Sequence, residues 1–358
     1  MFSQKTLSQV NVEGKTVLVR TDFNVPIKNQ EVQSDFRIQA TLPTLQYLLN
    51  HHAGRIVLIS HLGRPNGQVD PSLSLAPVSR VLSKLINRPV IFIPEAVGGS
   101  VKKTIQSAPL GSVILLENLR FYQGEEANSL DFANRVVKET AADLFVQDGF
   151  AVIHRAHAST TQIPKLLPTV AGFLLENEVT NLTKSFTSPN HPLLIIIGGA
   201  KIADKQPLID RFLPIADHIV VAGKIAADGF QSDNPKIYVA KDFRLDSAGN
   251  KLDIGDQSLS EILALIQQSR TIVWNGTVGK TETAPFDTSS KAIAEAIGQK
   301  SSEFNQTIIL GGDTSSFVEK IIRSQEDQKL NFSLISTGGG ASLEFLLGLP
   351  LPGLEAIN

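Results

Sequence analysis

Charged side chains follow the apolar runs in the first half of the chain, at the points where buried strands would end. These residues are Arg20, Asp22, His61, Arg64, Arg120, Asp148, His154, Arg155 and His157. Arginine and histidine side chains grouped in this way bind small anions such as phosphates and carboxylates. One arginine at a strand end is usually an ion-pair partner, but four strands that end in cations favour a binding site for a small anion.

In the second half, four apolar runs end in glycine instead. The glycines are Gly198, Gly199, Gly276, Gly311, Gly312, Gly338, Gly339 and Gly340. A glycine turn after a strand lets backbone N–H groups approach a polyphosphate closely. One half of the chain is therefore suited to a nucleotide and the other to a small anionic substrate, and this division indicates a kinase.

Two lysines and one aspartate strengthen the interpretation of the second half. Lys201 and Lys205 are four residues apart, so we expect them to share a face of the first turn of a helix. Two ammonium groups there oppose the helix dipole, which favours a bound anion. Asp313 follows a glycine pair and would hold Mg²⁺ on a nucleotide phosphate, because hard cations prefer carboxylate oxygen. The alternative is that Asp313 or Thr314 only caps a helix.

Two familiar nucleotide motifs are excluded by their spacing. The segment 275–281 is similar to a P-loop, but that motif needs four residues between its glycines. Here only two residues separate Gly276 from Gly279. No G-x-G-x-x-G fingerprint follows a strand either, which disfavours a nicotinamide-dependent enzyme.

Composition sets broad limits on the function. The 358 residues suggest about two domains, and the net charge of −2 gives no sign of nucleic-acid binding. The chain has no cysteine, which excludes disulfides, thiolate metal sites and a cysteine nucleophile. The N-terminus does not have the pattern of a signal peptide, and no apolar run is long enough to span a bilayer. We therefore expect a cytoplasmic protein without a membrane partner.

Apolar runs alternate with amphipathic segments along the whole chain. Runs that are apolar throughout, separated by helices, predict parallel sheets covered on both faces. The expected fold class is α/β, with two doubly wound, Rossmann-like parallel-sheet domains. Helices are expected over residues 37–50, 77–86, 129–141, 171–184, 202–212, 259–267, 289–297, 315–322 and 342–347. The helix over 171–184 is expected to join the domains, since proline and polar residues interrupt the pattern directly after it.

Ten segments together carry a family resemblance. They are Arg20-Thr-Asp-Phe-Asn-Val-Pro26, Asp35-Phe-Arg-Ile38, Ser60-His-Leu-Gly-Arg-Pro65, Leu116-Glu-Asn-Leu-Arg-Phe121, His154-Arg-Ala-His157, Ala171-Gly-Phe173, Gly198-Gly-Ala-Lys201, Trp274-Asn-Gly276, Gly311-Gly-Asp313 and Ser336-Thr-Gly-Gly-Gly-Ala341. In these segments, and in their order, the chain resembles the phosphoglycerate kinase family along nearly its whole length. Any one segment is weak evidence, but ten in order are very specific.

The resemblance implies reversible phosphoryl transfer between Mg-ATP and the carboxylate of 3-phosphoglycerate, giving 1,3-bisphosphoglycerate and ADP in glycolysis or gluconeogenesis. It implies an N-terminal 3-phosphoglycerate domain over 1–170, a helix over 171–184 and a C-terminal nucleotide domain over 185–350. It also implies a tail over 351–358 that returns to the first domain, a hinged cleft between the domains, and a monomer. The residues that match substrate-binding positions are Asp22, Asn24, Arg37, His61, Arg64, Arg120 and Arg155.

The residues that match nucleotide-binding positions are Gly199, Lys201, Lys205, Asn275, Glu282, Gly312, Asp313, Thr314, Gly338 and Gly339, with Asp313 as the metal ligand. Arg37 and Lys201 match the catalytic pair that flanks the transferred group. Such a transfer needs alignment and neutralisation of charge, and it needs no protein base because a carboxylate is already ionised.

The chain departs from the family pattern at two segments near the expected nucleoside site. Where the family has three glycines followed by Met-Ala, this chain has Val221-Ala-Gly-Lys-Ile225. Where the family has Pro-Met-Gly-Val-Phe before a glutamate, this chain has Thr277-Val-Gly-Lys-Thr281 before Glu282. Lost glycines add Cβ atoms where a base or ribose would pack, and Lys224 and Lys280 add cations. A weakened or altered nucleotide preference is therefore one hypothesis. A binding module without turnover, or a nucleotide enzyme with another acceptor, is the alternative function.

Overall fold

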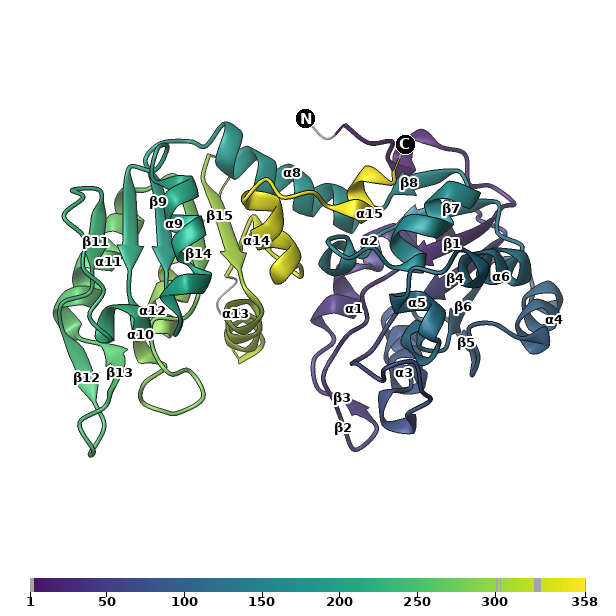
Figure 1. Ribbon diagram of the computed structural model, residues 1–358, viewed down its shortest axis with the longest axis horizontal. Coiled ribbons are helices and arrows are strands. Elements are labelled where there is room, and N and C mark those ends of the chain that lie inside the picture. The colour runs from purple at the N-terminus through teal and green to yellow at the C-terminus, as the bar shows by residue number, and fades with distance from the viewer. Residues whose placement is uncertain (1–2, 301, 303, 325–329, 358) are drawn as a thin grey trace. The chain divides into compact units, whose positions relative to one another are not determined.

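The computed structural model of the chain describes residues 3–300, 302, 304–324 and 330–357. It divides into two compact units, each built on one sheet (Figure 1). Unit 1 contains Met1–Asn177 and Pro350–Asn358, and unit 2 contains Glu178–Leu349. The predicted α/β class is confirmed, because each unit has a six-stranded parallel sheet. No helix in the described part of the chain is long and apolar enough to cross a bilayer.

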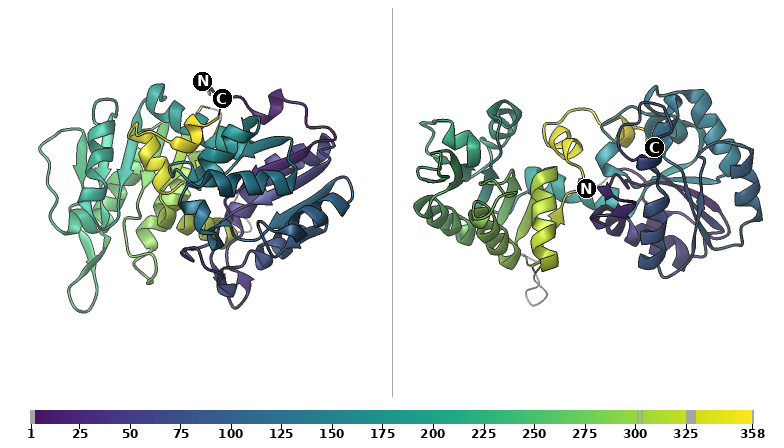
Figure 2. Two further views of the ribbon diagram at one scale, coloured as in Figure 1. Left: turned by 45° about the vertical axis from the view of Figure 1, so that its right-hand side comes forward. Right: turned by 90° about the horizontal axis from the view of Figure 1, so that it is seen from below.

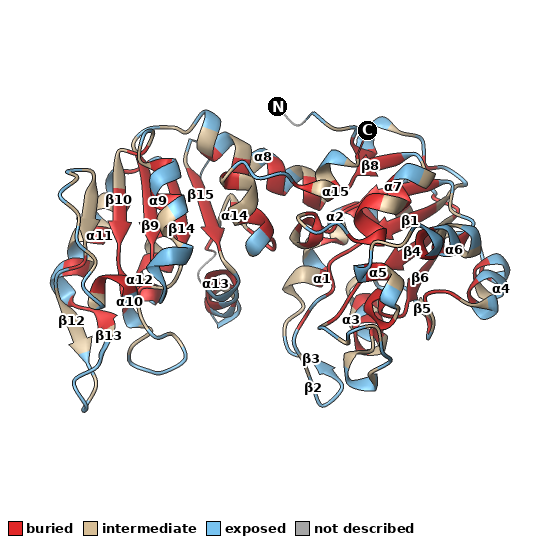
Figure 3. Ribbon diagram, viewed as in Figure 1, coloured by how far each residue is buried: buried red, intermediate tan, exposed pale blue. Residues whose placement is uncertain are grey.

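The sheet of unit 1 has the strand order β5-β6-β4-β1-β7-β8. Its strands are β1 (Thr16–Arg20), β4 (Arg55–Ile59), β5 (Val90–Ile93), β6 (Ser112–Leu116), β7 (Leu144–Gln147) and β8 (Thr169–Ala171), and a small hairpin pairs β2 (Ile27–Lys28) with β3 (Glu31–Val32). Successive side chains of a strand point to opposite faces. Val17 and Val19 of β1 pack in one core cluster, while Leu18 between them packs in another. Both faces of the sheet are thus buried, as the continuous apolar runs predicted (Figure 3).

Helices cover these two faces (Figure 2). They are α1 (Phe36–Ala40), α2 (Leu42–Asn50), α3 (Ala76–Leu85), α4 (Gly99–Ser107), α5 (Gln123–Glu126), α6 (Leu130–Thr140), α7 (Ile163–Leu166) and, from the C-terminal tail, α15 (Pro352–Glu355). Helices α2 and α3 contribute Leu45 and Leu82 to one core cluster, while α4 and α6 contribute Ile105 and Val136 to the other. The tail belongs to this unit, and Gly353 N donates to Ile153 O at 2.8 Å.

The single helix expected over 37–50 is wrong, because the segment forms two helices that meet at Thr41. Pro43 lies in the first turn of α2. Proline has no N–H to donate and its ring clashes with the carbonyl four residues earlier, so it is tolerated where a helix begins and breaks a helix that would run through it. The break sets Arg37 on a short helix of its own.

The sheet of unit 2 has the strand order β11-β10-β9-β14-β15-β16. Its strands are β9 (Leu193–Ile197), β10 (His218–Val221), β11 (Ile237–Val239), β14 (Thr271–Asn275), β15 (Gln306–Leu310) and β16 (Leu334–Ile335). Its helices are α9 (Gln206–Phe212), α10 (Gly223–Ala227), α11 (Asp256–Gln268), α12 (Thr288–Lys300), α13 (Gly312–Ser324) and α14 (Gly340–Leu346). The fully buried Trp274 of β14 lies in a core cluster with Ile262 of α11 and Ile293 of α12.

Three features of the second half differ from the expectations. The helix over 202–212 is a 3-10 turn, η6 (Ile202–Asp204), followed by α9, with Pro207 in the first turn of α9. The helix expected over 171–184 is α8 (Phe173–Thr187), and Ala171 belongs to β8. A two-stranded hairpin of β12 (Phe243–Leu245) and β13 (Lys251–Ile254), which the sequence patterns did not predict, precedes α11.

Candidate active site

Four adjacent strands of unit 1, in the order β6-β4-β1-β7, carry the expected anion-binding residues. Parallel strands have their carboxyl ends at one edge of the sheet, and ligands of open α/β sheets bind there. Asp22 follows β1, His61 follows β4, Arg120 follows β6 and Arg155 follows β7. The topology therefore gathers at one sheet edge residues that are far apart in the sequence.

Asp22 organises the centre of this cluster. Its carboxylate is buried, and Oδ2 accepts a hydrogen bond from Nη1 of Arg37. Oδ1 lies 3.9 Å from Nδ1 of His61. The Arg37 side chain keeps 26% of its surface exposed. Asp22 thus orients a guanidinium that still has free donors facing solvent, which suits a phosphate or carboxylate ligand.

Asn24 and Arg120 hold the turn that carries Arg64. Asn24 Oδ1 accepts from Gly63 N at 2.9 Å, and Arg120 Nη1 donates to Gly63 O at 2.7 Å. Arg120 also pairs with Glu126 at 3.2 Å. Burial lowers the pKa of Arg120, and the charges of Arg155 and Arg64 lower it further. The exposed Arg64 and Arg155 therefore contribute to the same positive field as Arg120.

A buried network beneath the cluster was not predicted from the sequence. Arg20 is fully buried, and its Nε donates to Ser159 Oγ at 2.8 Å. Ser159 Oγ in turn donates to Oε1 of the buried Glu125 at 2.5 Å. Glu125 Oε1 also lies 4.0 Å from Nη2 of Arg20. Burial raises the pKa of Glu125, while the nearby Arg20 charge opposes the rise. No local pattern marks Glu125, because its partner Ser159 is 34 residues away.

Two histidines of the cluster, His61 and His157, are neutral at pH 7. Burial, reinforced by the charge of Arg20, lowers the pKa of His61 well below its usual value. Burial and the charge of Arg120 lower the pKa of His157 to about 4. The positive charge offered to an anion therefore comes from the arginines, and each neutral imidazole can still donate or accept one hydrogen bond.

Asp148, grouped with the anion-site residues by its position after β7, has a structural role instead. It is fully buried, and Oδ1 accepts from Thr44 Oγ1 at 2.9 Å and from Leu174 N at 3.0 Å. Thr44 Oγ1 also accepts from Phe173 N at 2.9 Å. These bonds cap the first turn of α8, whose N–H groups have no partners within the helix. Asp148 is therefore a capping residue.

The glycine turns of unit 2 need glycine for steric reasons. Gly199, Gly276 and Gly311 have φ values of +96°, +100° and +91°, which side chains other than glycine's rarely adopt. A Cβ on Gly198 would lie 2.3 Å from Thr277 O, and one on Gly276 would lie 2.3 Å from Gly198 O. The turns after β9 and β14 are thus packed backbone to backbone at the edge where phosphates are expected.

A polar group without a partner lies at this edge. Asn275 is fully buried, and its Oδ1 accepts from Nζ of Lys205. Its Nδ2 has no hydrogen-bond partner, although it lies near the Gly311 turn. Burial lowers the pKa of Lys205, and the charges of Asp204 and Asp313 oppose this effect. A buried donor without an acceptor costs about 1–3 kcal/mol, so an oxygen atom of a ligand is the natural partner for Nδ2.

The other expected nucleotide residues lie around this point. Lys201 is exposed and precedes η6, so Lys201 and Lys205 flank a 3-10 turn and do not share the first turn of an α-helix. Gly312 and the exposed Asp313 begin α13, and Thr314 is buried with its Oγ1 accepting from Gly276 N at 2.9 Å.

Glu282, Gly338 and Gly339 are the remaining expected residues, and they lie at a cavity beside α13 and in the turn before α14. Glu282 and Asp313 line a cavity of about 400 Å³ beside α13. Gly338 and Gly339 precede α14 and do not line this cavity or the second cavity described below. The turn before them is held by Thr337 N, which donates to Glu178 Oε1 at 2.7 Å. Hydrogen bonds join Lys205 to Asn275 and Thr314 to Gly276, so these residues meet at the turn after β14.

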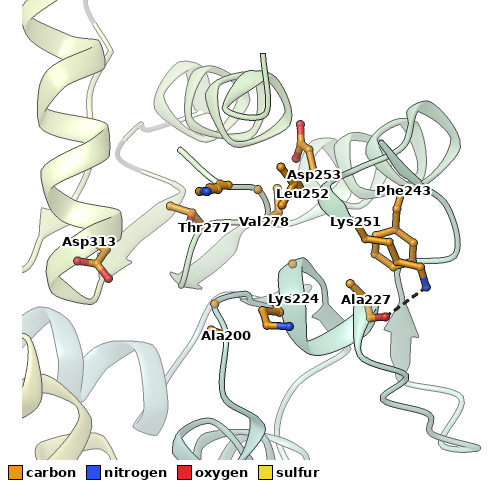
Figure 4. Close-up of a pocket in the computed structure, with 14 residues that line it drawn as sticks. Ala200, Lys224, Ala227, Phe243, Lys251, Leu252, Asp253, Thr277, Val278 and Asp313 are labelled. Atoms are coloured by element: carbon orange, nitrogen blue, oxygen red, sulfur yellow. Dashed lines mark hydrogen bonds between the residues drawn. The ribbon is translucent and has the colours of Figure 1, made fainter. Parts of the chain in front are cut away.

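A second cavity, of about 260 Å³, lies beside the hairpin (Figure 4). Gly199, Lys224 and Lys280 are among its lining residues. Val221 and Ala222, at the altered segment, are fully buried and do not line it. The residues that replace the family's glycines, Val221 and Ala222, therefore add no Cβ to the cavity. The polar and charged groups of the cavity come from its lysines and from the hairpin.

A two-domain α/β fold, with an arginine-rich sheet edge in one unit and glycine turns in the other, defines a kinase of small anionic substrates. The sequence profile of the phosphoglycerate kinase family matches residues 7–237 and 225–349. The chain therefore belongs to the phosphoglycerate kinase family of glycolytic enzymes, and its activity is that of a phosphoglycerate kinase.

Relatives and solved structures agree with this membership. The phosphoglycerate kinases of Orientia tsutsugamushi (strain Boryong) and Thermosipho africanus (strain TCF52B) are each 36% identical to the chain, covering 100% and 98% of it and 98% and 97% of their own lengths. The structure of phosphoglycerate kinase from Coxiella burnetii has a TM-score of 0.79 at 30% identity, with 99% of both chains covered. That from Pyrococcus horikoshii OT3 has a TM-score of 0.86 at 27% identity, covering 99% of this chain and 98% of that one.

Proposed function

We propose that unit 1 binds 3-phosphoglycerate and unit 2 binds Mg-ATP, and that the chain transfers the γ-phosphoryl group reversibly to the carboxylate of 3-phosphoglycerate. The observation that carries this proposal is the arginine cluster at one sheet edge of unit 1. Three of its arginines, Arg37, Arg120 and Arg20, are fixed by Asp22, Glu126 and the Ser159–Glu125 pair, so this part of the cluster is ordered before a ligand arrives. Ordering in advance lowers the entropic cost of binding an anion.

In unit 1, the exposed Arg64 and Arg155, together with the largely buried Arg120, would bind the phosphate. Arg37 would bind the carboxylate that receives the phosphoryl group. Asp22, Asn24 and His61 position these groups and the substrate hydroxyl. Because His61 and His157 are neutral at pH 7, they are suited to hydrogen bonding rather than to charge neutralisation. We propose Arg37 and Lys201 as the two groups that neutralise charge on the transferred phosphoryl group.

In unit 2, the residues present fit a nucleotide with one magnesium ion. Asn275 Nδ2 is a buried donor without a partner, and Lys205 is a partly buried cation beside it. No group of three or more acidic or histidine side chains suited to holding a metal occurs among the described residues. This agrees with Mg²⁺, which is usually held by one or two carboxylates together with substrate phosphates. Asp313 would supply the carboxylate, and the bound ion would neutralise phosphate charge.

The remaining expected residues complete the nucleotide site. The N–H groups of Gly312 and Gly339 would approach the phosphates, as glycine turns permit. Gly199 N donates to Thr277 O at 3.0 Å and Gly338 N donates to Ser336 Oγ at 3.0 Å, so these two glycines would shape the turns around the phosphates. Thr314 would hold the turns together through its bond to Gly276. Glu282 would bind the ribose, because a carboxylate accepts hydrogen bonds from hydroxyl groups.

A coupled assay of 3-phosphoglycerate-dependent ADP formation tests the proposal. Lys201→Ala should lower kcat about 100-fold or more, as expected for removal of a group that stabilises charge in the transition state. Lys236→Ala is a matched control, because Lys236 donates to Leu213 O at 3.3 Å and lines neither cavity. Equal activity of Lys201→Ala and the wild type would remove Lys201 from the mechanism. Binding of both ligands without turnover in the wild type would support a binding module instead.

A further inference from the structure

The cavity beside the hairpin is walled by backbone on one side and by side chains of β12 and β13 on the other. Its lining includes Gly199, Gly223, Val278 and Gly279 from the turns after β9, β10 and β14, and Phe243 and Lys251 from the hairpin. The cavity is next to the turns assigned above to phosphate binding, and it contains an aromatic ring and apolar side chains. These are the usual components of a site for a planar base.

The hairpin holds a cation at the wall of this cavity. Lys251 Nζ lies 4.7 Å from the centroid of the Phe243 ring and donates to Ala227 O at 3.2 Å. Figure 4 shows Lys251 next to Phe243, with the bond to Ala227 dashed. The ammonium group carries three donors and uses one of them on Ala227. Its position is set by two interactions, and it has donors left for a ligand.

Several acceptors around the cavity are already engaged, and the Asp313 carboxylate, which also lines it, is assigned above to Mg²⁺. Ala227 O accepts from Lys251, and Thr277 O accepts from Gly199 N at 3.0 Å. The carboxylate of Asp253 accepts from Ile254 N at 2.9 Å and from Ser289 N at 3.2 Å. The same carboxylate forms an ion pair with Arg244 at 3.3 Å. A ligand that presents an amino group to this wall would therefore compete with bonds that the protein already makes.

Purine bases differ at the atom that such a wall would detect. Adenine carries an amino donor at position 6, while guanine and hypoxanthine carry a carbonyl acceptor there next to the acceptor N7. Lysine is a donor only, and it pairs with the O6 and N7 edge of guanine. Lys280 also lines the cavity and adds a positive charge, while Lys224, another lining residue, is paired with Asp228 at 2.7 Å.

We propose that this cavity is a base pocket that prefers a 6-oxopurine nucleotide, such as a guanine nucleotide, over an adenine nucleotide, with Lys251 as the specificity-determining residue. The inference depends on the proposed function, since it concerns the base of the same nucleotide. Under this proposal ATP still donates its phosphoryl group, and GTP and ITP are better phosphoryl donors. Inosine nucleotides have the 6-carbonyl without the 2-amino group of guanine, so they isolate the contact in question.

The test compares kcat/KM for Mg-ATP, Mg-GTP and Mg-ITP in 3-phosphoglycerate-dependent turnover. We expect GTP and ITP to exceed ATP by about fivefold or more, the lower end of discrimination by a good base contact. Lys251→Met removes the ammonium and should bring the ratio of GTP to ATP close to one. Lys251→Arg keeps the donors and should keep the preference. Lys236→Met, which removes a lysine with the same kind of bond to a main-chain carbonyl, should leave the ratio unchanged.

A wild-type preference for ATP would overturn the proposal, as would a ratio that Lys251→Met does not change. Failure of the proposed function would look different, because no nucleotide would then support turnover. In that case calorimetric titration with GDP, IDP and ADP tests the pocket directly. GDP and IDP that bind at least about fivefold more tightly than ADP, and that lose this advantage in Lys251→Met, would support the pocket assignment. Equal affinities for the three nucleotides would refute it.

Discussion

Asp148 is expected to make unit 1 less stable as the pH rises. Burial raises the pKa of Asp148 from 3.8 to about 7, even though hydrogen bonds from Thr44, Leu174 and Leu175 favour the ionised form. A carboxylate at the N-terminus of a helix usually gains about 0.3–1 kcal/mol from the helix dipole. Here the cost of desolvation is larger, in part because Oδ2 has no hydrogen-bond partner.

The direction and size of the effect follow from the two pKa values. Because the folded-state pKa is above the unfolded-state value, protonation of Asp148 favours the folded state. This stabilisation is fully present below pH 3.8 and is lost as the pH rises through about 7. Between pH 5 and pH 8 the stabilisation falls mainly over the two pH units from pH 5 to the folded-state pKa of about 7. Each of these units corresponds to about 1.4 kcal/mol. Asp148 alone should therefore lower the free energy of unfolding by about 3 kcal/mol over this range.

Asp148→Asn removes the titration and keeps an oxygen for Thr44 and Leu174. Its amide nitrogen would be a buried donor where Oδ2 has no partner, at a cost of about 1–3 kcal/mol that does not depend on pH. The informative quantity is therefore the change with pH of the difference between variant and wild type. That difference should move by about 3 kcal/mol in favour of the variant between pH 5 and pH 8.

Urea unfolding at both pH values measures this difference. Far-UV circular dichroism follows both units, while the single tryptophan, Trp274, reports on unit 2 and allows the two transitions to be separated. Asp131→Asn, at an exposed position in the first turn of α6, serves as the control and should show the wild-type pH dependence. If the difference between Asp148→Asn and the wild type stays constant from pH 5 to pH 8, the reasoning about burial is refuted.

Three further outcomes are expected. Glu125→Gln leaves the buried Arg20 without its counter-charge and should lower the free energy of unfolding of unit 1 by about 3 kcal/mol. A loss below about 1 kcal/mol in urea unfolding would contradict the role given to Glu125. Gly198→Ala places a Cβ 2.3 Å from Thr277 O and should destabilise unit 2 by about 1–3 kcal/mol. Gly312→Ala is the control, because a Cβ there meets nothing within 4 Å, and it should leave the free energy of unfolding of unit 2 unchanged. Trp274 fluorescence in urea measures both variants. Lys205→Met should weaken Mg-ADP binding about tenfold or more in calorimetry, and unchanged affinity would exclude Lys205 from the phosphate site.

Local patterns along the chain were sufficient for the α/β class and for the strand ends. Continuous apolar runs predict buried parallel strands because both faces of such a sheet must be covered. Residues that directly follow those strands then share one edge, which is why Asp22, His61 and Arg120 were recognised as a group. Proline effects were readable in principle, since Pro43 and Pro207 each stand where a predicted helix breaks.

Other features depend on residues that are distant in sequence, and only the tertiary structure decided them. Asp148 follows a strand like the anion-site residues, yet its bonds to Thr44 and Leu174 make it a helix cap. Glu125 gains its role from Ser159, and Lys251 gains its role from Phe243 and Ala227. Residue type and spacing along the chain define which chemistry is available. The burial and the partners that set charge state and specificity arise only when distant segments pack together.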